Sequence, residues 1–145
     1  MQKKYVRAGV GIMLLIENKV LLGKRHDDPE KASSELHGEG TWTFPGGKAD
    51  FGLTLVENVN KELMEETGIK VNSLKLLSIT DEIVPDAHFT TIGFLCTDFE
   101  GEARVLEPDE ITQWKWFDLS ELPLNIYPAS KKMIDNYNDN VIYRI

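Results

Sequence analysis

Apolar residues in the first third of the chain form short runs separated by turn-forming residues. Residues 10–16 and 20–23 are two apolar runs separated by Glu17-Asn18-Lys19, a spacing that predicts a β-hairpin. Residues 26–40 are polar and contain Pro29, two serines and two glycines, which predicts a long surface loop of the kind that often carries function. Residues 41–44 predict a short strand that ends at Pro45-Gly46-Gly47.

A helix is the clearest prediction in the middle of the chain. Thr54 and Glu57 have the spacing of a capping box, and Gly68 stands where a helix starting there would end. Strands are expected at residues 74–80, 89–97 and 113–117, and Val105 is expected to begin another. Of Trp114 and Trp116 on the last strand, we expect one to pack in the core and the other to face outward.

A second helix at residues 128–138 completes the pattern. It would place an apolar stripe on one face, formed by Ala129, Met133 and Tyr137. Strands, one helix, further strands and a final helix together predict a mixed sheet covered by helices, which is an α/β fold. The length of 145 residues fits a single domain spanning 1–145.

Charge and cysteine content narrow the classes of function. A formal net charge of −8 and the lack of a basic stripe in the sequence argue against binding to a nucleic-acid backbone. The apolar run at residues 8–16 is too short to span a bilayer, so no membrane partner is expected. A single cysteine, Cys96, is expected to be a buried structural residue, and it fits a reducing, cytoplasmic location.

Acidic residues gather on one side of the first helix. With Glu62 set at 0°, Glu66 falls at about 40° and Glu65 at about −60°, so three carboxylates share one arc. The adjoining stripe, expected to be buried, consists of Val56, Val59 and Leu63. Such crowded carboxylates favour a hard divalent cation with oxygen ligands, above all Mg²⁺. The alternative is a solvated acidic helix face.

The spacing around this helix resembles the Nudix box. The box reads glycine, five residues, glutamate, seven residues and then arginine-glutamate-aliphatic-any-glutamate-glutamate-any-glycine-aliphatic. Residues 47–69 keep that spacing throughout and hold seven of its nine defined residue types. Residues 21–25, 43–48, 107–108 and 114–123 also resemble segments of the triphosphate-directed branch of this family. The resemblance implies a Nudix-type α/β/α sandwich with a mixed sheet.

The resemblance also implies roles for acidic residues. Glu62, Glu65 and Glu66 would bind Mg²⁺, with Mn²⁺ as an alternative ion, and one of them would accept a proton from the attacking water. The catalytic set implied by the box is therefore Glu62, Glu65 and Lys61. A further metal-binding carboxylate is expected from the second half of the chain, and position selects Glu107. The alternative is that Glu107 is an exposed loop acid.

Four residues are candidates for substrate binding. Gly46 and Gly47 allow a close approach of the backbone to another group, and Arg25 and Lys48 are candidate phosphate contacts. For the two cations the alternative is a solvated surface position.

Two positions depart from the box. Leu53 stands where the first glutamate is expected, and Lys61 stands where the box has arginine. Leucine cannot help to assemble a metal cluster, and lysine lacks the planar fork of arginine. Asn58 or Asp50 could supply the missing oxygen. Alternatively, Leu53 packs against Val56 or a substrate base.

Three functions remain open at this stage. The first is a Mg²⁺-dependent hydrolase that cleaves a nucleoside triphosphate to a monophosphate and pyrophosphate. The second is a hydrolase of nucleotide sugars or other nucleoside diphosphate compounds, and the third is a nucleotide-binding module with a weakened catalytic box. Each has a small-molecule nucleotide as its partner, a homodimer is left open, and the sequence does not select the base or the sugar.

Overall fold

The computed structural model describes residues 3–32 and 36–145; part of the predicted 26–40 loop, residues 33–35, lies outside the described residues. The elements in chain order are β1 (Val6–Ile16), β2 (Lys19–Arg25), β3 (Trp42–Thr43), β4 (Gly46–Lys48), α1 (Leu55–Thr67), β5 (Lys70–Val71), β6 (Lys75–Val84), β7 (Ala87–Cys96), β8 (Phe99–Glu100), β9 (Ile111–Asp118) and α2 (Pro128–Asp139). The order of strands and helices is the one expected of an α/β fold.

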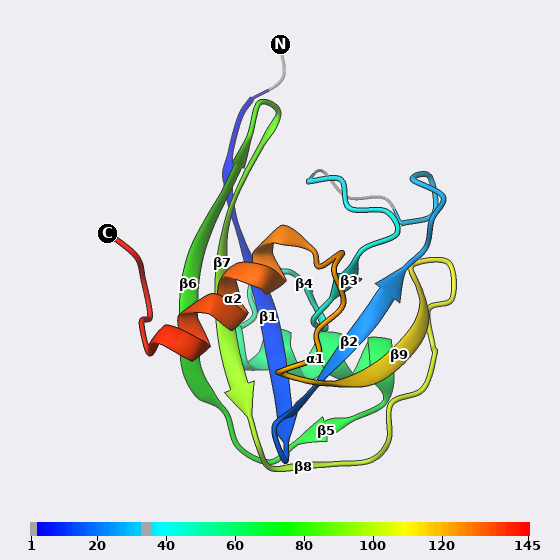
Figure 1. The fold of residues 1–145 in the computed structure, drawn as a ribbon. Coiled ribbons are helices and arrows are strands. Elements are labelled where there is room, and N and C mark those ends of the chain that lie inside the picture. Colours follow the sequence, from blue (N-terminus) through cyan, green and yellow to red (C-terminus); the bar gives the residue numbers. More distant parts are fainter. Residues whose placement is uncertain (1–2, 33–35) are drawn as a thin grey trace.

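The main sheet is mixed, as predicted. Its strand order is β3-β2-β1-β7-β6, with β4 pairing to β1 and β9 pairing to β2 (Figure 1). β1 and β7 run parallel over nine residue pairs, from Val6–His88 to Leu14–Cys96, whereas the other neighbours are antiparallel. A separate short pair, β5 and β8, joins the end of α1 to the segment after β7.

The predicted hairpin is confirmed, and its strands then separate. Glu17 and Asn18 have φ angles of 48° and 66°, the left-handed conformation that a tight hairpin turn requires. β1 and β2 pair only beside this turn, at Leu15–Val20 and Ile16–Lys19. Further from the turn β1 pairs instead with β4, through the residues Gly9 to Gly11. This change of partner brings the Gly46–Lys48 segment against the middle of the sheet.

The first helix begins and ends as the sequence predicts. The Thr54 hydroxyl accepts from the Glu57 backbone N–H at 3.1 Å, and the Glu57 carboxylate accepts from the Thr54 N–H at 3.0 Å. Gly68 ends the helix in the left-handed conformation, with φ 79°. The expected apolar stripe is partly wrong, because Val59 and Leu63 are fully buried but Val56 is 47% exposed.

Two smaller predictions are wrong, and one predicted strand is shorter than expected. Val105 does not begin a strand: it lies in the connection from β8 to β9, where the neighbouring Arg104 N–H bonds to the Thr67 carbonyl. The strand expected at 41–44 is shortened to β3, and the chain after Pro45 forms the additional strand β4. Trp114 and Trp116 pack against the same core cluster, because residues two apart on a strand face the same side.

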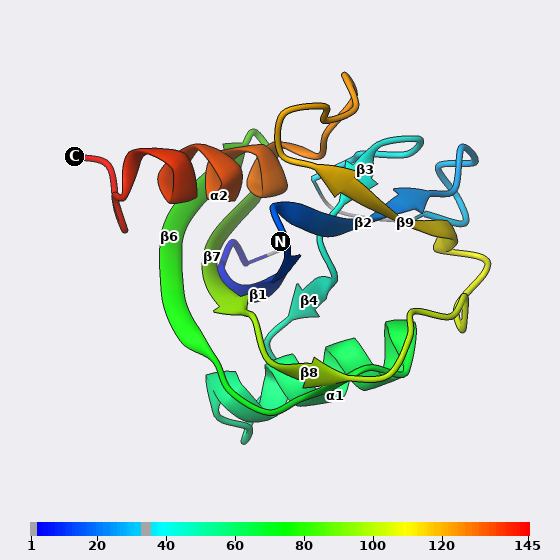
Figure 2. The ribbon, with the colours of Figure 1, turned by 60° about the horizontal axis from the view of Figure 1, so that its bottom comes forward.

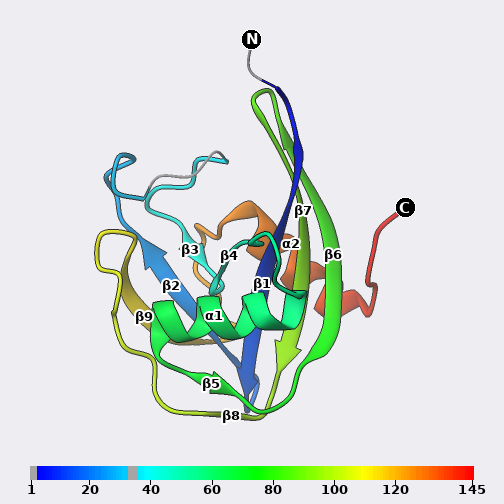
Figure 3. The same cartoon turned by 180° about the vertical axis from the view of Figure 1, so that it is seen from behind.

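The two helices cover opposite sides of the sheet (Figures 2 and 3). One core cluster joins Val59 and Leu63 of α1 to Ile12 and Leu14 of β1, and the other joins Met133 and Ile134 of α2 to strands β1 and β2. The stripe predicted for α2 is confirmed, with Ala129 and Met133 buried and Tyr137 partly buried. In residues 3–32 and 36–145 no helix is long and apolar enough to cross a membrane.

Candidate active site

A cavity of about 470 Å³ lies where β1, β4, α1 and the start of α2 meet. Its wall contains the carboxylates Glu62 and Glu66 and the apolar side chains Phe89 and Met133, with Tyr127 beside them. The volume is within the range of small-molecule sites, which are commonly 300–1,000 Å³. Acidic and apolar groups thus face the same space.

Gly46 and Gly47 of β4 lie between β1 and the acidic helix face. A Cβ atom on Gly46 would lie only 2.1 Å from the Val10 carbonyl oxygen, and one on Gly47 would lie 2.7 Å from Oε2 of Glu62. Only glycine therefore lets the strand fit between β1 and α1. The Gly46 N–H also donates to Oε2 of Glu66 at 2.9 Å, which fixes the start of β4 against the helix.

The three helix carboxylates differ in burial. Glu65 is exposed, Glu62 is partly buried and Glu66 is only 7% exposed, so the alternative of a solvated acidic helix face is wrong for Glu66. Its position at about 40° on the helical wheel turns it toward β4, whereas Glu65 lies on the solvent side.

Burial and neighbouring negative charges both raise the pKa values of Glu62 and Glu66. Burial, followed by the charge of Glu65, raises the pKa of Glu62 to about 7. Burial raises the pKa of Glu66 well above its usual range, against the opposing hydrogen bond from Gly46. A positive charge placed beside these two carboxyl groups would stabilise their deprotonated forms.

Two acids from the segment before β9 also influence this cluster. The charge of Glu107 raises the pKa of Glu62 and of Glu66, so the residue selected by position lies near the helix carboxylates. Glu110, which the sequence analysis missed, lines the cavity itself, and its charge raises the pKa of Glu66. Its backbone carbonyl accepts from the His26 N–H, which fixes it beside β2. The signal available in the sequence was its place directly before the β9 run.

The donor set fits a hard divalent cation in its chemistry. Within the described ranges, no three Asp, Glu, His or Cys side chains converge closely enough to hold a metal ion as they stand. The neighbouring donors are nevertheless all carboxylate oxygens, the ligands that Mg²⁺ prefers, and their mutual repulsion raises the pKa of Glu62. A cation between them would remove that repulsion.

Lys61 lies on the solvent side of this cluster. Its ammonium donates to Oδ2 of Asp50 at 2.5 Å and lies 3.7 Å from Oε1 of Glu65. The hydrogen bond to Asp50, together with the charges of Asp50 and Glu65, raises the pKa of Lys61. The lysine that replaces the arginine of the box therefore joins the loop before the helix to the helix itself.

The structure distinguishes the two residues, Asn58 and Asp50, that could supply the oxygen ligand missing at Leu53. Asn58 is fully buried, its oxygen accepts from the Asp50 N–H at 2.8 Å and its amide donates to the Thr54 carbonyl, so this side chain fastens the loop to the helix. Asp50 lines the cavity. Leu53 is 37% exposed, and its expected partner Val56 is exposed too, so neither side chain belongs to the core.

Arg25 and Lys48 both line the cavity. The Arg25 guanidinium donates to the Gly38 carbonyl at 2.9 Å and to the Ala32 carbonyl at 2.7 Å, and it lies over the Tyr127 ring. Two N–H groups of Arg25 thus hold described residues of the 26–40 loop against the cavity.

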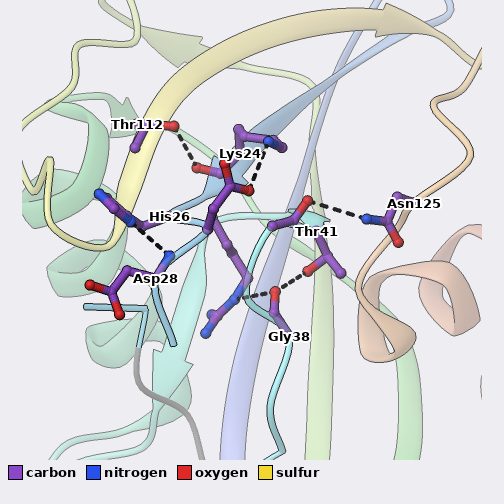
Figure 4. Close-up of polar contacts among 10 residues, drawn as sticks. Lys24, His26, Asp28, Gly38, Thr41, Thr112 and Asn125 are labelled. Carbon is purple, nitrogen blue, oxygen red and sulfur yellow. Dashed lines mark hydrogen bonds and ion pairs between the residues drawn. The ribbon is translucent and has the colours of Figure 1, made fainter. Parts of the chain in front are cut away.

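Further contacts anchor the same loop at its two ends (Figure 4). The Asp28 N–H donates to Nδ1 of His26, and the Thr41 hydroxyl donates to the Gly38 carbonyl at 2.6 Å. The Asn125 amide donates to the Gly40 carbonyl, which ties the loop to the segment before α2. The described part of the loop is therefore held by these hydrogen bonds as one wall of the cavity.

Comparison with known proteins extends over nearly the whole chain. A family model described as the NUDIX domain matches residues 6–137. An ADP-ribose pyrophosphatase from Methanocaldococcus jannaschii is 32% identical over 90% of this chain and 74% of its own length. An 8-oxo-dGTP diphosphatase from Proteus vulgaris is 34% identical over 70% of this chain and 85% of its own. The crystal structure of a MutT NUDIX hydrolase from Burkholderia pseudomallei has a TM-score of 0.82 and 31% identity, covering 92% of this chain and 98% of that one.

Proposed function

This chain belongs to the Nudix family of hydrolases, which act on phosphoric anhydride bonds, and we propose that its own reaction is the Mg²⁺-dependent hydrolysis of a nucleoside triphosphate to a monophosphate and pyrophosphate. The Nudix-type fold inferred from the sequence is confirmed by the match to the solved structure. The proposal concerns the substrate, the metal and the roles of individual residues.

One observation carries the proposal: carboxylates and apolar side chains line a single cavity. Glu62 and Glu66 lie on the wall supplied by α1, and Phe89 and Met133 lie on the walls supplied by β7 and α2. A nucleotide has the same two-part chemistry, with a flat base and a charged phosphate chain. The 470 Å³ cavity suits one nucleoside with its phosphates.

The residues on the cavity wall suggest how the reaction proceeds. Bound Mg²⁺, held by Glu62, Glu65, Glu66 and an acid from the 107–110 segment, would neutralise charge on the phosphate oxygens. Glu62 lines the cavity, and one of its carboxylate oxygens would accept the proton of the attacking water.

Cations and backbone complete the proposed site. The Lys48 ammonium and the Arg25 guanidinium would contribute positive charge on the substrate side of the cavity. Gly46 and Gly47 keep that side free of side chains next to the carboxylates. Attack of water in line with the leaving pyrophosphate is the reaction that such an arrangement supports.

A second candidate is the hydrolysis of a nucleoside diphosphate joined to a sugar. The observation in its favour is the relative named as an ADP-ribose pyrophosphatase, which matches 90% of this chain. The same carboxylates would serve both reactions, so the difference lies in the group beyond the second phosphate.

Product analysis separates the candidates. The purified chain is incubated with the eight common nucleoside triphosphates, 8-oxo-dGTP, ADP-ribose and UDP-glucose, each with Mg²⁺ or with EDTA, and products are followed by ³¹P NMR. A nucleoside monophosphate and pyrophosphate in equal amounts are expected from at least one triphosphate with Mg²⁺ alone. AMP and ribose phosphate from ADP-ribose, without triphosphate cleavage, would select the second candidate. Binding without turnover of any compound would select the nucleotide-binding module.

A further inference from the structure

The segment from Gly46 to Asp50, which precedes α1, is bonded to the helix at both of its ends. At its start the Gly46 N–H bonds to Glu66, and at residue 50 the backbone N–H of Asp50 donates to the Asn58 oxygen at 2.8 Å. Asn58 is fully buried, and its amide donates to the Thr54 carbonyl at 2.8 Å. The backbone of Asp50 is therefore held in place by a buried side chain, unlike the backbone of a loop without such a contact.

The Asp50 carboxylate is directed to Lys61 and to the cavity together. It accepts from the Lys61 ammonium at 2.5 Å, it lines the cavity with Glu62 and Glu66, and its charge acts on Glu62. The ammonium is also 3.7 Å from Glu65. Lys61 thus lies between a loop carboxylate and the helix carboxylates.

We propose that Asp50 and Lys61 are a positioning pair that compensates for the two departures from the box, with Asp50 supplying the negative charge that Leu53 cannot. The inference rests on the proposed function, because the carboxylates being positioned are those assigned to the metal. Asp50 holds the ammonium on the solvent side, 3.7 Å from Glu65, so Glu62 remains available to a cation. Without Asp50, the ammonium would pair with those carboxylates and compete with the ion.

This competition makes a specific prediction for single and double variants. Asp50→Asn keeps the backbone bond to Asn58 but releases the Lys61 ammonium, and divalent cation binding should weaken about tenfold, as expected for a group that supports metal ligands. Lys61→Gln removes the competitor, so Asp50→Asn/Lys61→Gln should bind the cation within about threefold of the parent. Lys61→Arg keeps a positively charged side chain beside Asp50, so this variant should bind the divalent cation as tightly as the parent.

Cation affinity is measured without substrate, by titrating the full chain with Mn²⁺ in a calorimeter, and each melting temperature is recorded as a check of folding. The matched control is the exposed pair on α2, Lys131–Asp135, whose ammonium and carboxylate lie 2.6 Å apart. Asp135→Asn should leave Mn²⁺ affinity unchanged. Turnover is a second readout: Asp50→Asn should lower kcat about tenfold or more with KM changed less than about threefold.

The outcomes distinguish this proposal from the function on which it rests. Tight Mn²⁺ binding and turnover in the parent, with affinity lost in Asp50→Asn and regained in the double variant, support the pair. The same parent behaviour with a double variant as weak as Asp50→Asn, or with an unaffected Asp50→Asn, overturns the pair alone. A parent that neither binds Mn²⁺ nor hydrolyses any compound overturns both proposals.

Discussion

The raised pKa of Glu62 predicts that the metal-free protein loses stability as the pH increases. Burial and the charge of Glu65 raise this pKa from the ordinary 4.5 to about 7 in the folded chain. Between those two values the folded carboxyl holds a proton that the unfolded chain has released. The contribution of this proton to folding is complete below about pH 4.5 and is lost as the pH rises through about 7.

The magnitude follows from the size of that increase. A pKa raised from 4.5 to about 7 corresponds to about 3.4 kcal/mol at most. Because Glu62 is only partly buried, screening by solvent reduces this to about 1–2 kcal/mol. For a domain of this length, that change lowers the melting temperature by about 3–8 °C between pH 5 and pH 8.

The assay compares the parent with Glu62→Gln, which cannot titrate at this position. Thermal unfolding is followed by circular dichroism in EDTA at pH 5 to 8, and the difference between the two proteins reports the titration of Glu62 together with its effect on the pKa of Glu66. Saturating Mg²⁺ should stabilise the parent more at pH 8 than at pH 5, since the cation requires the deprotonated carboxylate. Parallel pH profiles for the two proteins in EDTA, or a larger effect of Mg²⁺ at pH 5, would refute this reasoning.

Three further predictions concern the cavity wall. Gly47→Ala places a Cβ atom 2.7 Å from the Glu62 carboxylate, so the carboxylate must move, and steady-state kinetics should show kcat reduced about 10²-fold. Glu110→Gln should weaken Mn²⁺ binding more than Glu107→Gln in the same calorimetric titration, because Glu110 lines the cavity; the reverse order would return the role to Glu107. Leu53→Glu should change stability by less than about 0.5 kcal/mol in urea unfolding, since the side chain is 37% exposed, and should raise kcat less than about threefold because a loop carboxylate already pairs with the helix lysine. A gain of 10²-fold would show that Leu53 limits the enzyme.

Features set by neighbouring residues could be predicted from the sequence. The capping box of Thr54 and Glu57 and the left-handed Gly68 depend on contacts within one or two turns of helix, so their spacing was sufficient. The Glu17-Asn18 turn is similarly local. The family resemblance rests mainly on spacing within residues 47–69, and the comparisons bear it out.

Features set by distant residues could not be predicted in the same way. The helical wheel placed Glu66 and Glu65 on one arc, but it could not show that β4 would lie over Glu66 and bury it. Val56 is exposed for the converse reason: the sheet covers only the part of the helix centred on Val59 and Leu63.

The loop acids illustrate the same limit. Glu107 and Glu110 are both acids in one polar segment, and the hydrogen bond that the His26 N–H donates to the Glu110 carbonyl joins distant parts of the chain. The role of Asp50 depends on Asn58, eight residues later and buried, a residue that the sequence alone makes a candidate ligand. The charge of Arg25 predicts a phosphate contact, whereas two of its N–H groups donate to the Ala32 and Gly38 carbonyls of the 26–40 loop.

Glu66→Gln tests the central claim most directly. Glutamine keeps the shape of the buried side chain and can still accept the Gly46 N–H, so the fold and the melting temperature in EDTA should be retained. With saturating Mg²⁺ and the best nucleoside triphosphate of the panel, pyrophosphate release should fall about 10²-fold or more, and the parent should show no release in EDTA. Parent turnover that persists in EDTA, or a folded Glu66→Gln variant as active as the parent, would contradict metal-dependent hydrolysis at these carboxylates.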